Sequence, residues 1–144
     1  MWNFIQKQYT EFGLFLLRFF SGLGIMMHGQ RKLFVGGMDG FTENVANLGF
    51  PIPGLFAWVA ALSEFLGGVL LALGLGTRIA ALFIAGTMIV AAFISSAGAS
   101  FFAREKALLY LTVMVTFMFT RGGRYSLDYY IHQWKETLKT EIQE

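Results

Sequence analysis

Residues 54–75 read GLFAWVAALSEFLGGVLLALGL, and Glu64 is the only charged residue among them. About 20 apolar residues in a helix are enough to cross the hydrocarbon core of a bilayer. A carboxylate at the centre of a bilayer costs about 2.5–3.5 kcal/mol on insertion scales, so such groups are generally paired or functional. The stretch therefore predicts a membrane-spanning helix whose buried Glu64 needs a partner.

The composition of the whole chain agrees with a membrane protein. Charged residues make up 14% of the 144 residues and hydrophobic residues 56%, whereas a soluble domain carries about 25% charged residues. The net charge is only +2 and the basic residues are scattered, which argues against a nucleic-acid partner. The absence of cysteine excludes disulfides, thiol nucleophiles and iron–sulfur ligation by this chain. We expect a single integral membrane domain over residues 1–144 that contacts the lipid bilayer.

The apolar stretches predict an all-α fold, an antiparallel four-helix bundle in the membrane. Its last element is an amphipathic helix that lies at the interface with water, because apolar residues recur there at helical spacing. The four spans and the interfacial tail are expected at about residues 12–29, 54–75, 79–97, 107–120 and 126–140.

The long connection over residues 30–53 also contains a short helical pattern. Phe41, Val45 and Leu48 recur at helical spacing, which predicts one or two turns of helix at the membrane interface. Pro51 and Pro53 then end this segment before the second span.

The distribution of basic residues predicts the orientation in the membrane. With four spans, six lysines and arginines lie on the side of both termini and four on the other side, so the positive-inside rule puts both termini in the cytoplasm. The six are Lys7, Arg78, Arg121, Arg124, Lys135 and Lys139, and the four are Arg31, Lys32, Arg104 and Lys106.

Depth in the membrane suggests Arg18 as the partner of Glu64. Arg18 is two to three residues from the midpoint of the first span, about 4 Å, and Glu64 is close to the midpoint of the second. A buried Arg18–Glu64 pair would neutralise both charges. Two interpretations stay open. The pair is a clamp that fixes helix register, or it lines a polar pocket for a headgroup, a quinone oxygen, a proton or a substrate anion.

A second polar cluster is expected toward the opposite membrane face. His28 and Lys32 are four residues apart, and Glu105 opens the fourth span at the same level. A His28–Glu105 contact would suit proton exchange near neutral pH. The alternative is an interfacial histidine beside basic side chains that extend to water. One histidine in the spans, no cysteine and few clustered carboxylates predict no metal site.

Taken in order along the chain, five segments resemble the DoxX family, and the resemblance covers about residues 12–130. The segments are LLRFFSGLGIMMHGQRKLF (16–34), GFTENVANLGFPIP (40–53), SEFLGGVLLALGLGTRIAAL (63–82), KALLYLTVMVTF (106–117) and GGRYSLD (122–128). The positions that match the family pattern are Arg18, His28, Lys32, Glu64, Gly67, Gly68, Arg78 and Tyr125 to Asp128.

The resemblance implies a four-helix protein of a bacterial or archaeal cytoplasmic membrane. The family takes its name from subunits of a thiosulfate:quinone oxidoreductase, and other members are similar to membrane partners of redox, thiol-stress or quinone-stress systems. Three functions are left open: an oxidoreductase subunit that binds quinone near Glu64, Arg18 and His28, a transporter of a weak acid or proton, and a structural anchor for soluble enzymes. No cofactor other than a quinone is suggested. Soluble or membrane oxidoreductase subunits, or further copies of the chain, are the expected partners.

Overall fold

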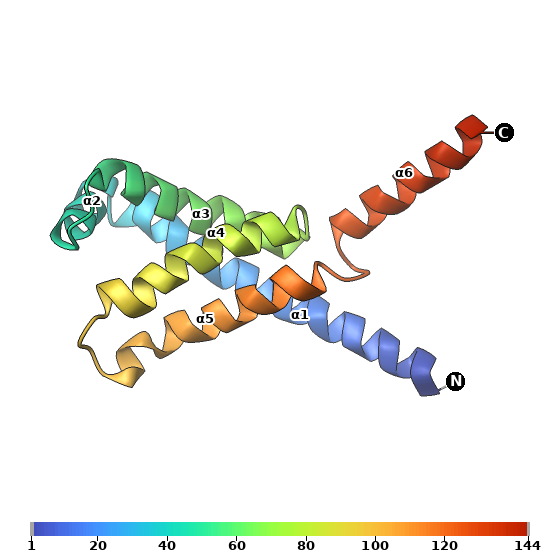
Figure 1. Ribbon diagram of the computed structural model, residues 1–144, viewed down its shortest axis with the longest axis horizontal. Coiled ribbons are helices and arrows are strands. Elements are labelled where there is room, and N and C mark those ends of the chain that lie inside the picture. Colours follow the sequence, from blue (N-terminus) through green and yellow to red (C-terminus); the bar gives the residue numbers. More distant parts are fainter. Residues whose placement is uncertain (1, 144) are drawn as a thin grey trace.

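The computed structural model describes residues 2–143, and all of its regular elements are helices (Figure 1). No strand occurs within residues 2–143, so the all-α prediction is confirmed. The α-helices are α1 (Trp2–Gln30), α2 (Met38–Asn47), α3 (Pro53–Leu73), α4 (Thr77–Ile89), α5 (Phe101–Thr120) and α6 (Leu127–Gln143), and two π-helices, η1 (Arg31–Val35) and η2 (Val90–Ser95), continue α1 and α4.

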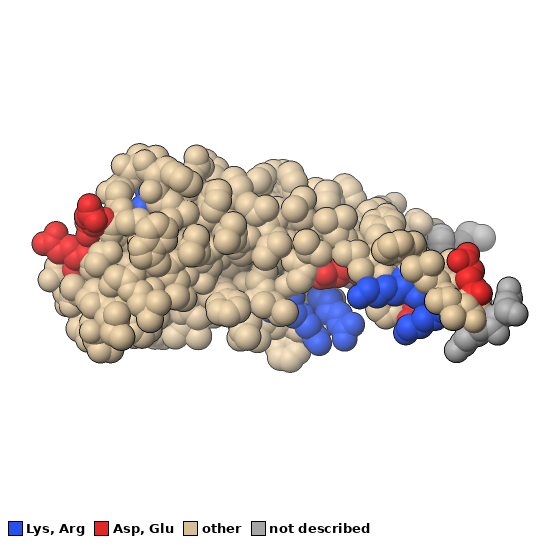
Figure 2. Space-filling model, turned by 90° about the horizontal axis from the view of Figure 1, so that it is seen from above, with Lys and Arg blue, Asp and Glu red and all other residues tan. Residues whose placement is uncertain are grey.

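Three helical segments are long and apolar enough to cross a membrane: Ile5–Val35, Pro53–Leu73 and Thr77–Ser95. They cover the first three predicted spans. Helix α5 covers the fourth, but its first two turns carry Arg104, Glu105 and Lys106, which lower its apolar character. On the face shown in Figure 2, charged side chains lie at the tip of one end and over the half of the molecule toward the other end, and a broad surface almost free of charge separates the two groups. The chain is a membrane protein.

The core lies between α1, α3, α4 and α5. Helix α1 packs on α3, α3 on α4, and α4 on α5, with further contacts between α1 and α5. Ile25, Leu71, Ile84, Met114 and Phe117 are completely buried between these helices. Each of the four helices therefore contributes at least one large apolar side chain to the core.

Glycines set the register of α1 against α3. A Cβ atom at Gly22 would lie only 2.6 Å from the backbone nitrogen of Ala72, and a Cβ at Gly29 would collide with the backbone of Phe65. Since the earlier glycine of α1 lies beside the later residue of α3, the two helices run in opposite directions. Their backbones are in close contact, as small residues allow in membrane proteins.

The turn between α3 and α4 is closed by a residue far along the chain. Helix α3 ends at Gly74, whose φ of 72° is the left-handed conformation that favours glycine. Asp128, at the start of α6, accepts hydrogen bonds from the backbone nitrogens of Gly76 (2.7 Å) and Thr77 (2.9 Å) and from the Thr77 hydroxyl (2.9 Å). Asp128 thereby caps the N-terminus of α4.

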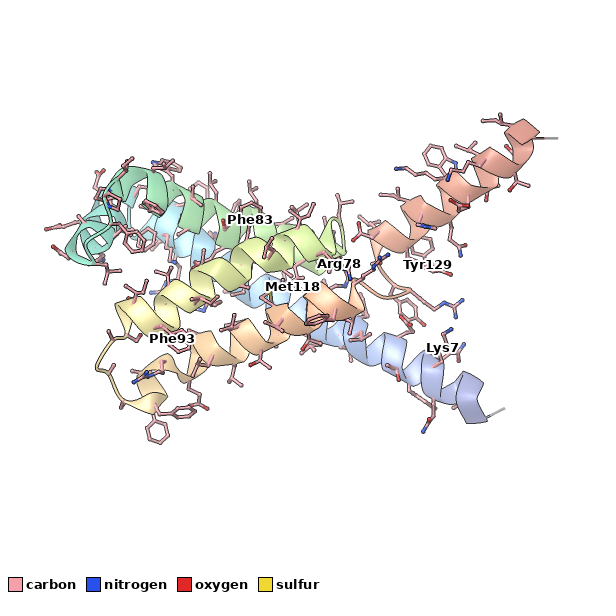
Figure 3. All side chains as sticks on the ribbon, in the orientation of Figure 1. Lys7, Arg78, Phe83, Phe93, Met118 and Tyr129 are labelled. Carbon is pink, nitrogen blue, oxygen red and sulfur yellow. The ribbon has the colours of Figure 1, made fainter. Side chains whose placement is uncertain are left out.

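The two ends of the bundle carry different elements. Helix α2 lies across one end, and α6 and the N-terminus project from the other (Figure 1). We call these the α2 end and the α6 end. At the α6 end, Arg78 of α4 donates a hydrogen bond of 2.8 Å to the carbonyl of Met118 on α5, and both side chains are labelled in Figure 3.

The predicted tail helix is present as α6. Leu127, Ile131, Trp134 and Leu138 follow one another at helical spacing, and all four side chains are exposed. Its place at the membrane interface stays a prediction.

The helical pattern in the long connection is also confirmed, as α2. The helix follows Gly37 (φ 74°) and precedes Gly49 (φ 84°), so both of its ends are turns that use the left-handed conformation. Its apolar face is directed at α3 and α4, since Val45 is 6% exposed and α2 packs on α3.

Candidate functional site

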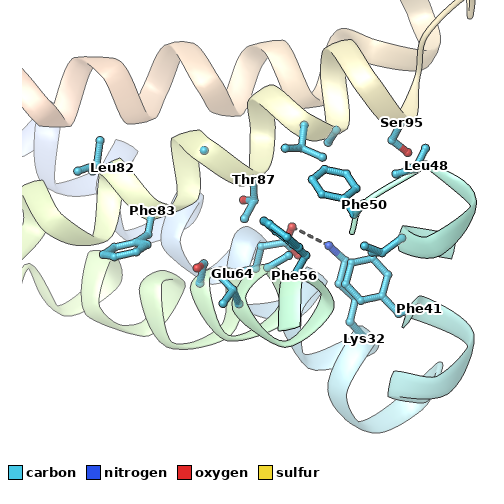
Figure 4. Close-up of a pocket in the computed structure, with 17 residues that line it drawn as sticks. Lys32, Phe41, Leu48, Phe50, Phe56, Glu64, Leu82, Phe83, Thr87 and Ser95 are labelled. Atoms are coloured by element: carbon cyan, nitrogen blue, oxygen red, sulfur yellow. Dashed lines mark hydrogen bonds and ion pairs between the residues drawn. The ribbon is translucent and has the colours of Figure 1, made fainter. Parts of the chain in front are cut away.

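A cavity of about 450 Å³ lies at the α2 end, between α2, α3 and α4 (Figure 4). Most of its wall is apolar, with the rings of Phe41, Phe50 and Phe56 among the lining side chains. The polar atoms come mainly from Lys32, Glu64, Ser63, Thr87 and Ser95. An apolar cavity with a few convergent polar groups is the usual form of a small-molecule site.

The local sequence explains how the wall is built. Phe41, Val45 and Leu48 line the cavity because their spacing puts them on one side of α2 and of its C-terminal cap, which is Leu48. Pro51 and Pro53 direct the chain into α3, and the rings of Phe50 and Phe56 pack across this bend with centroids 4.9 Å apart. The roof of the cavity is thus the segment between the first two membrane helices.

An ion pair stands in the wall of the cavity. The Nζ of Lys32, on η1, lies 2.6 Å from Oε1 of Glu64, on α3. The Glu64 side chain is 3% exposed and that of Lys32 28% exposed. The same ammonium group lies 4.5 Å from the centroid of the Phe41 ring, within the range of a cation–π interaction.

One half of the Glu64 carboxylate remains without a partner. Its Oε2 is buried and forms no hydrogen bond with any residue in the described part of the chain. An unsatisfied buried carboxylate oxygen is costly, and it is a strong acceptor for a hydroxyl or N–H group. Lys32 and Glu64 both line the apolar cavity, so the ion pair brings a donor group and a carboxylate to one part of its wall.

The predicted Arg18–Glu64 pair is wrong. Arg18 is 1% exposed, but its guanidinium donates hydrogen bonds to the backbone carbonyls of Leu71 (3.1 Å) and Tyr125 (2.8 Å). Among the described residues, the ionic partner of Glu64 is Lys32.

The register of the helices explains this correction. The depth argument assumes that the midpoints of the first two spans lie side by side, but Gly29, near the end of α1, lies against Phe65 in the middle of α3. With Gly22 beside Ala72, Arg18 reaches the last turn of α3, whereas Glu64 lies seven residues from Leu71, about 10 Å along the helix. Glu64 consequently faces the end of α1, where Lys32 follows.

The second predicted cluster is not assembled as expected. The His28 ring packs edge-on against Tyr110, with centroids 6.2 Å apart. Lys32 turns to Glu64 instead. Glu105 is exposed and forms no ion pair or hydrogen bond within the described residues. Of the three residues, His28 and Lys32 share a surface and Glu105 does not join them.

His28 and Lys32 line a second, more polar hollow. This basic pocket has a volume of about 420 Å³ and is bounded by η1, the glycines that follow it and α2. Arg31 and Asn44 contribute further polar atoms. Lys32 and Phe41 line both the cavity and the basic pocket, so these two side chains form the partition between the two hollows.

The described residues do not form a cluster of metal ligands. No group of three or more histidine, cysteine, aspartate or glutamate side chains lies together there. The ligand chemistry of the site consequently rests on the ion pair and the aromatic wall.

The DoxX family model matches residues 13–97. The chain belongs to the DoxX family. It is also similar to a Bacillus subtilis (strain 168) protein with the name "Putative oxidoreductase CatD", with 31% identity over 127 residues, 88% of this chain and 92% of the relative. No solved structure matches the chain significantly. The DoxX match includes every residue that lines the cavity, since these run from Lys32 to Ser95.

Sequence reasoning missed part of this DoxX site. It assigned Lys32 to another cluster and treated the face of Phe41, Val45 and Leu48 as a membrane-interface helix rather than the roof of a cavity. The spacing of Gly22 and Gly29 was an available signal, because glycines seven residues apart on one helical face mark where a neighbouring helix approaches closely.

Proposed function

We propose that this DoxX protein is the membrane subunit of a redox system and that it binds a quinone, hydroquinone or catechol ring in the cavity between α2, α3 and α4. The observation that carries the proposal is the half-satisfied carboxylate of Glu64, fixed by Lys32 in the wall of an apolar cavity. Such a site suits a flat, apolar molecule with oxygen atoms at one edge.

The chemistry of the ring matches the two groups. A quinone carbonyl accepts a hydrogen bond from the Lys32 ammonium, and the hydroxyl of a hydroquinone or catechol donates one to Oε2 of Glu64. The rings of Phe41, Phe50 and Phe56 offer apolar and edge or stacking contacts to the carbon skeleton. When bound, the ring supplies the exchange of electrons, and the residues of this chain bind and orient it.

Electrons must come from or go to another molecule in this proposal. The chain has no cysteine, and its described residues offer no cluster of metal ligands. We therefore propose a soluble or membrane oxidoreductase subunit as partner. The name of the Bacillus subtilis relative, an oxidoreductase, is in keeping with this setting.

The proposal includes a topology. We propose that α5 crosses the membrane as a fourth span, with Arg104, Glu105 and Lys106 at the interface, and that α1, α3, α4 and α5 form an antiparallel bundle. Both termini and α6 would then face the cytoplasm of a bacterial or archaeal cell, as the larger number of basic residues on that side predicts. The cavity would lie in the outer half of the membrane.

Direct binding tests the proposal. The purified chain in lipid nanodiscs is titrated with methylhydroquinone by calorimetry. We expect Glu64→Gln to weaken binding by about tenfold to 100-fold, because it removes a charge-assisted hydrogen bond worth about 1.5–3 kcal/mol. Glu105→Gln, an exposed carboxylate at the same end of the bundle, is the matched control and should bind like the wild type.

Loss of folding must be separated from loss of binding. Glu64→Gln leaves Lys32 without its anion, and breaking one side of a buried pair destabilises the fold. The double variant Lys32→Met/Glu64→Gln removes both charges, so it should fold and still fail to bind. Unchanged binding in this double variant would show that the ring does not use the pair.

Transport of a weak acid or proton is the second candidate. The observation that favours it is that Lys32 and Phe41 line both the apolar cavity and the basic pocket and so form the wall between them. Proteoliposomes loaded with a pH-sensitive dye distinguish the two functions. Proton flux driven by a phenolic acid, absent from Glu64→Gln, would support transport, and Glu64-dependent binding without flux would support the redox subunit.

A further inference from the structure

A long apolar groove continues from the cavity toward the α6 end. The groove has a volume of about 670 Å³ and runs along the outer seam of α3 and α4. Ser63 and Phe83 line both the cavity and the groove, so the two hollows meet at these side chains. The junction lies one residue from Glu64 along α3.

The walls of the groove are suited to a hydrocarbon chain. Leu66 and Leu70 of α3 stand on one side and Ile79 and Phe83 of α4 on the other, and all four are exposed on helices long and apolar enough to cross a membrane. The floor includes Gly67, which is buried against Ile84 of α4.

The length of the groove corresponds to one leaflet. From Ser63 to the end of α3 at Leu73 is ten residues, about 15 Å at 1.5 Å per residue. The hydrocarbon core of a bilayer is about 30 Å thick, so the groove follows about half of it.

We infer that the molecule whose ring occupies the cavity carries a hydrocarbon tail that lies in this groove, and that it enters the site from the bilayer between α3 and α4. The inference rests on the proposed function, because it assigns the tail of the same ligand. A polar head site with an unfilled acceptor continues directly into an apolar channel, which is the shape of an amphiphile with a ring at one end. The ligand class is thus a prenyl- or alkyl-substituted quinone or phenol.

Two probes with the same head test the tail. Methylhydroquinone and decylhydroquinone are titrated into the protein in nanodiscs, and affinity is expressed per mole fraction of probe in the bilayer, which removes the effect of partitioning. We expect the decyl compound to bind about fivefold to tenfold more tightly. The gain is modest because lipid chains are as apolar as the groove, so packing alone favours the tail.

Variants of the groove locate the tail. Ser63→Phe narrows the junction, and Ile79→Trp fills the seam away from the cavity; each should remove the gain of the decyl probe, and Ile79→Trp should leave methylhydroquinone binding unchanged. Ile89→Trp is the matched control, an exposed isoleucine of α4 that lines neither hollow, and should keep the gain.

The outcomes separate this inference from the proposed function. Equal affinity for the two probes, or a gain in affinity of the decyl probe that persists in Ile79→Trp, would overturn the inference that a tail lies in the groove. Glu64-dependent binding of the ring would be unaffected by either result. A lipid chain or a second copy of the protein in the groove would give equal affinities of this kind. Failure of both probes to bind through Glu64 would remove the proposed function itself.

Discussion

The two buried charges of the membrane helices have opposite surroundings. At the α6 end, Arg18 donates to the carbonyls of Leu71 and Tyr125, leaves its buried Nε without a partner among the described residues, and lines neither the cavity nor the groove. At the α2 end, Glu64 has one oxygen on Lys32 and one oxygen free beside a cavity of about 450 Å³. Burial alone does not distinguish them, since the whole residues are 1% and 2% exposed.

The two charges differ in whether they line a space that a ligand could fill. Arg18 joins the end of α3 to the turn between α5 and α6, so its bonds hold the backbone together. Glu64, by contrast, lines a cavity large enough for a ligand, and its Oε2 is buried without a hydrogen-bond partner among the described residues. We propose that the first charge contributes to stability and the second to binding.

The largest effect is expected at Arg18. Arg18→Met removes the two hydrogen bonds that the guanidinium donates to the carbonyls of Leu71 and Tyr125, and two charge-assisted hydrogen bonds at about 1.5–3 kcal/mol each suggest a loss of about 3–6 kcal/mol in the free energy of unfolding. Denaturation in mixed micelles, followed by circular dichroism, measures this loss. Arg124→Met, an exposed arginine of the same end, should cost far less. Equal losses for the two would show that Arg18 has no special place in the fold.

The next effect concerns coupling between the charges. In a double-mutant cycle of unfolding free energies, Lys32→Met and Glu64→Gln should be coupled by about 0.5–3 kcal/mol, because removal of either charge leaves the other unpaired. Arg18→Met and Glu64→Gln should instead add within about 0.5 kcal/mol. Strong coupling between Arg18 and Glu64 would reinstate the pair that the sequence suggested and break the comparison between the two ends.

The helices themselves were largely predictable from the sequence. The apolar run of α3, the glycines of the turn at residues 74–76, and the periodic residues of α2 and α6 are local signals, and the structure has a helix or turn at each. These elements depend on hydropathy, proline and glycine, which act within a few residues.

The partner of Glu64 was not predictable in the same way. Depth matching assumes that the midpoints of the two spans lie at the same level, whereas the contact of Gly29 with Phe65 brings the end of α1 beside the middle of α3. The actual register depends on backbone contacts at Gly22 and Gly29, which are properties of two helices together. The capping of α4 by Asp128 was not predicted for a similar reason, because Asp128 lies 51 residues from Thr77 in the sequence.

A smaller effect is expected for Asp128 at the α6 end. Asp128→Ala removes the acceptor for two backbone nitrogens and a hydroxyl at the start of α4, and loss of such a cap costs about 1–2 kcal/mol. Thermal denaturation should show this loss. The melting temperature of Asp128→Asn should lie between those of the wild type and Asp128→Ala, because asparagine keeps one acceptor oxygen. Methylhydroquinone affinity should not change in either variant. A change in affinity would mean that the two ends are coupled and do not divide stability from binding.

The smallest effect is expected at the exposed counterpart of the Lys32–Glu64 pair. Lys139 and Glu136 of α6 are 3.0 Å apart, with side chains 70% and 57% exposed, and the hydrogen bond from Lys139 lowers the pKa of Glu136. A lowered folded-state pKa adds stability above the ordinary pKa of glutamate, and this stability is lost as the pH falls through the lowered value. Water screens the pair so strongly that Lys139→Gln should leave the melting temperature unchanged at neutral and acidic pH. Lys32→Gln should lower it clearly at neutral pH. The same two groups thus differ in effect because one pair is beside a cavity in the membrane helices and the other is in water, and a comparable loss in both variants would remove that explanation.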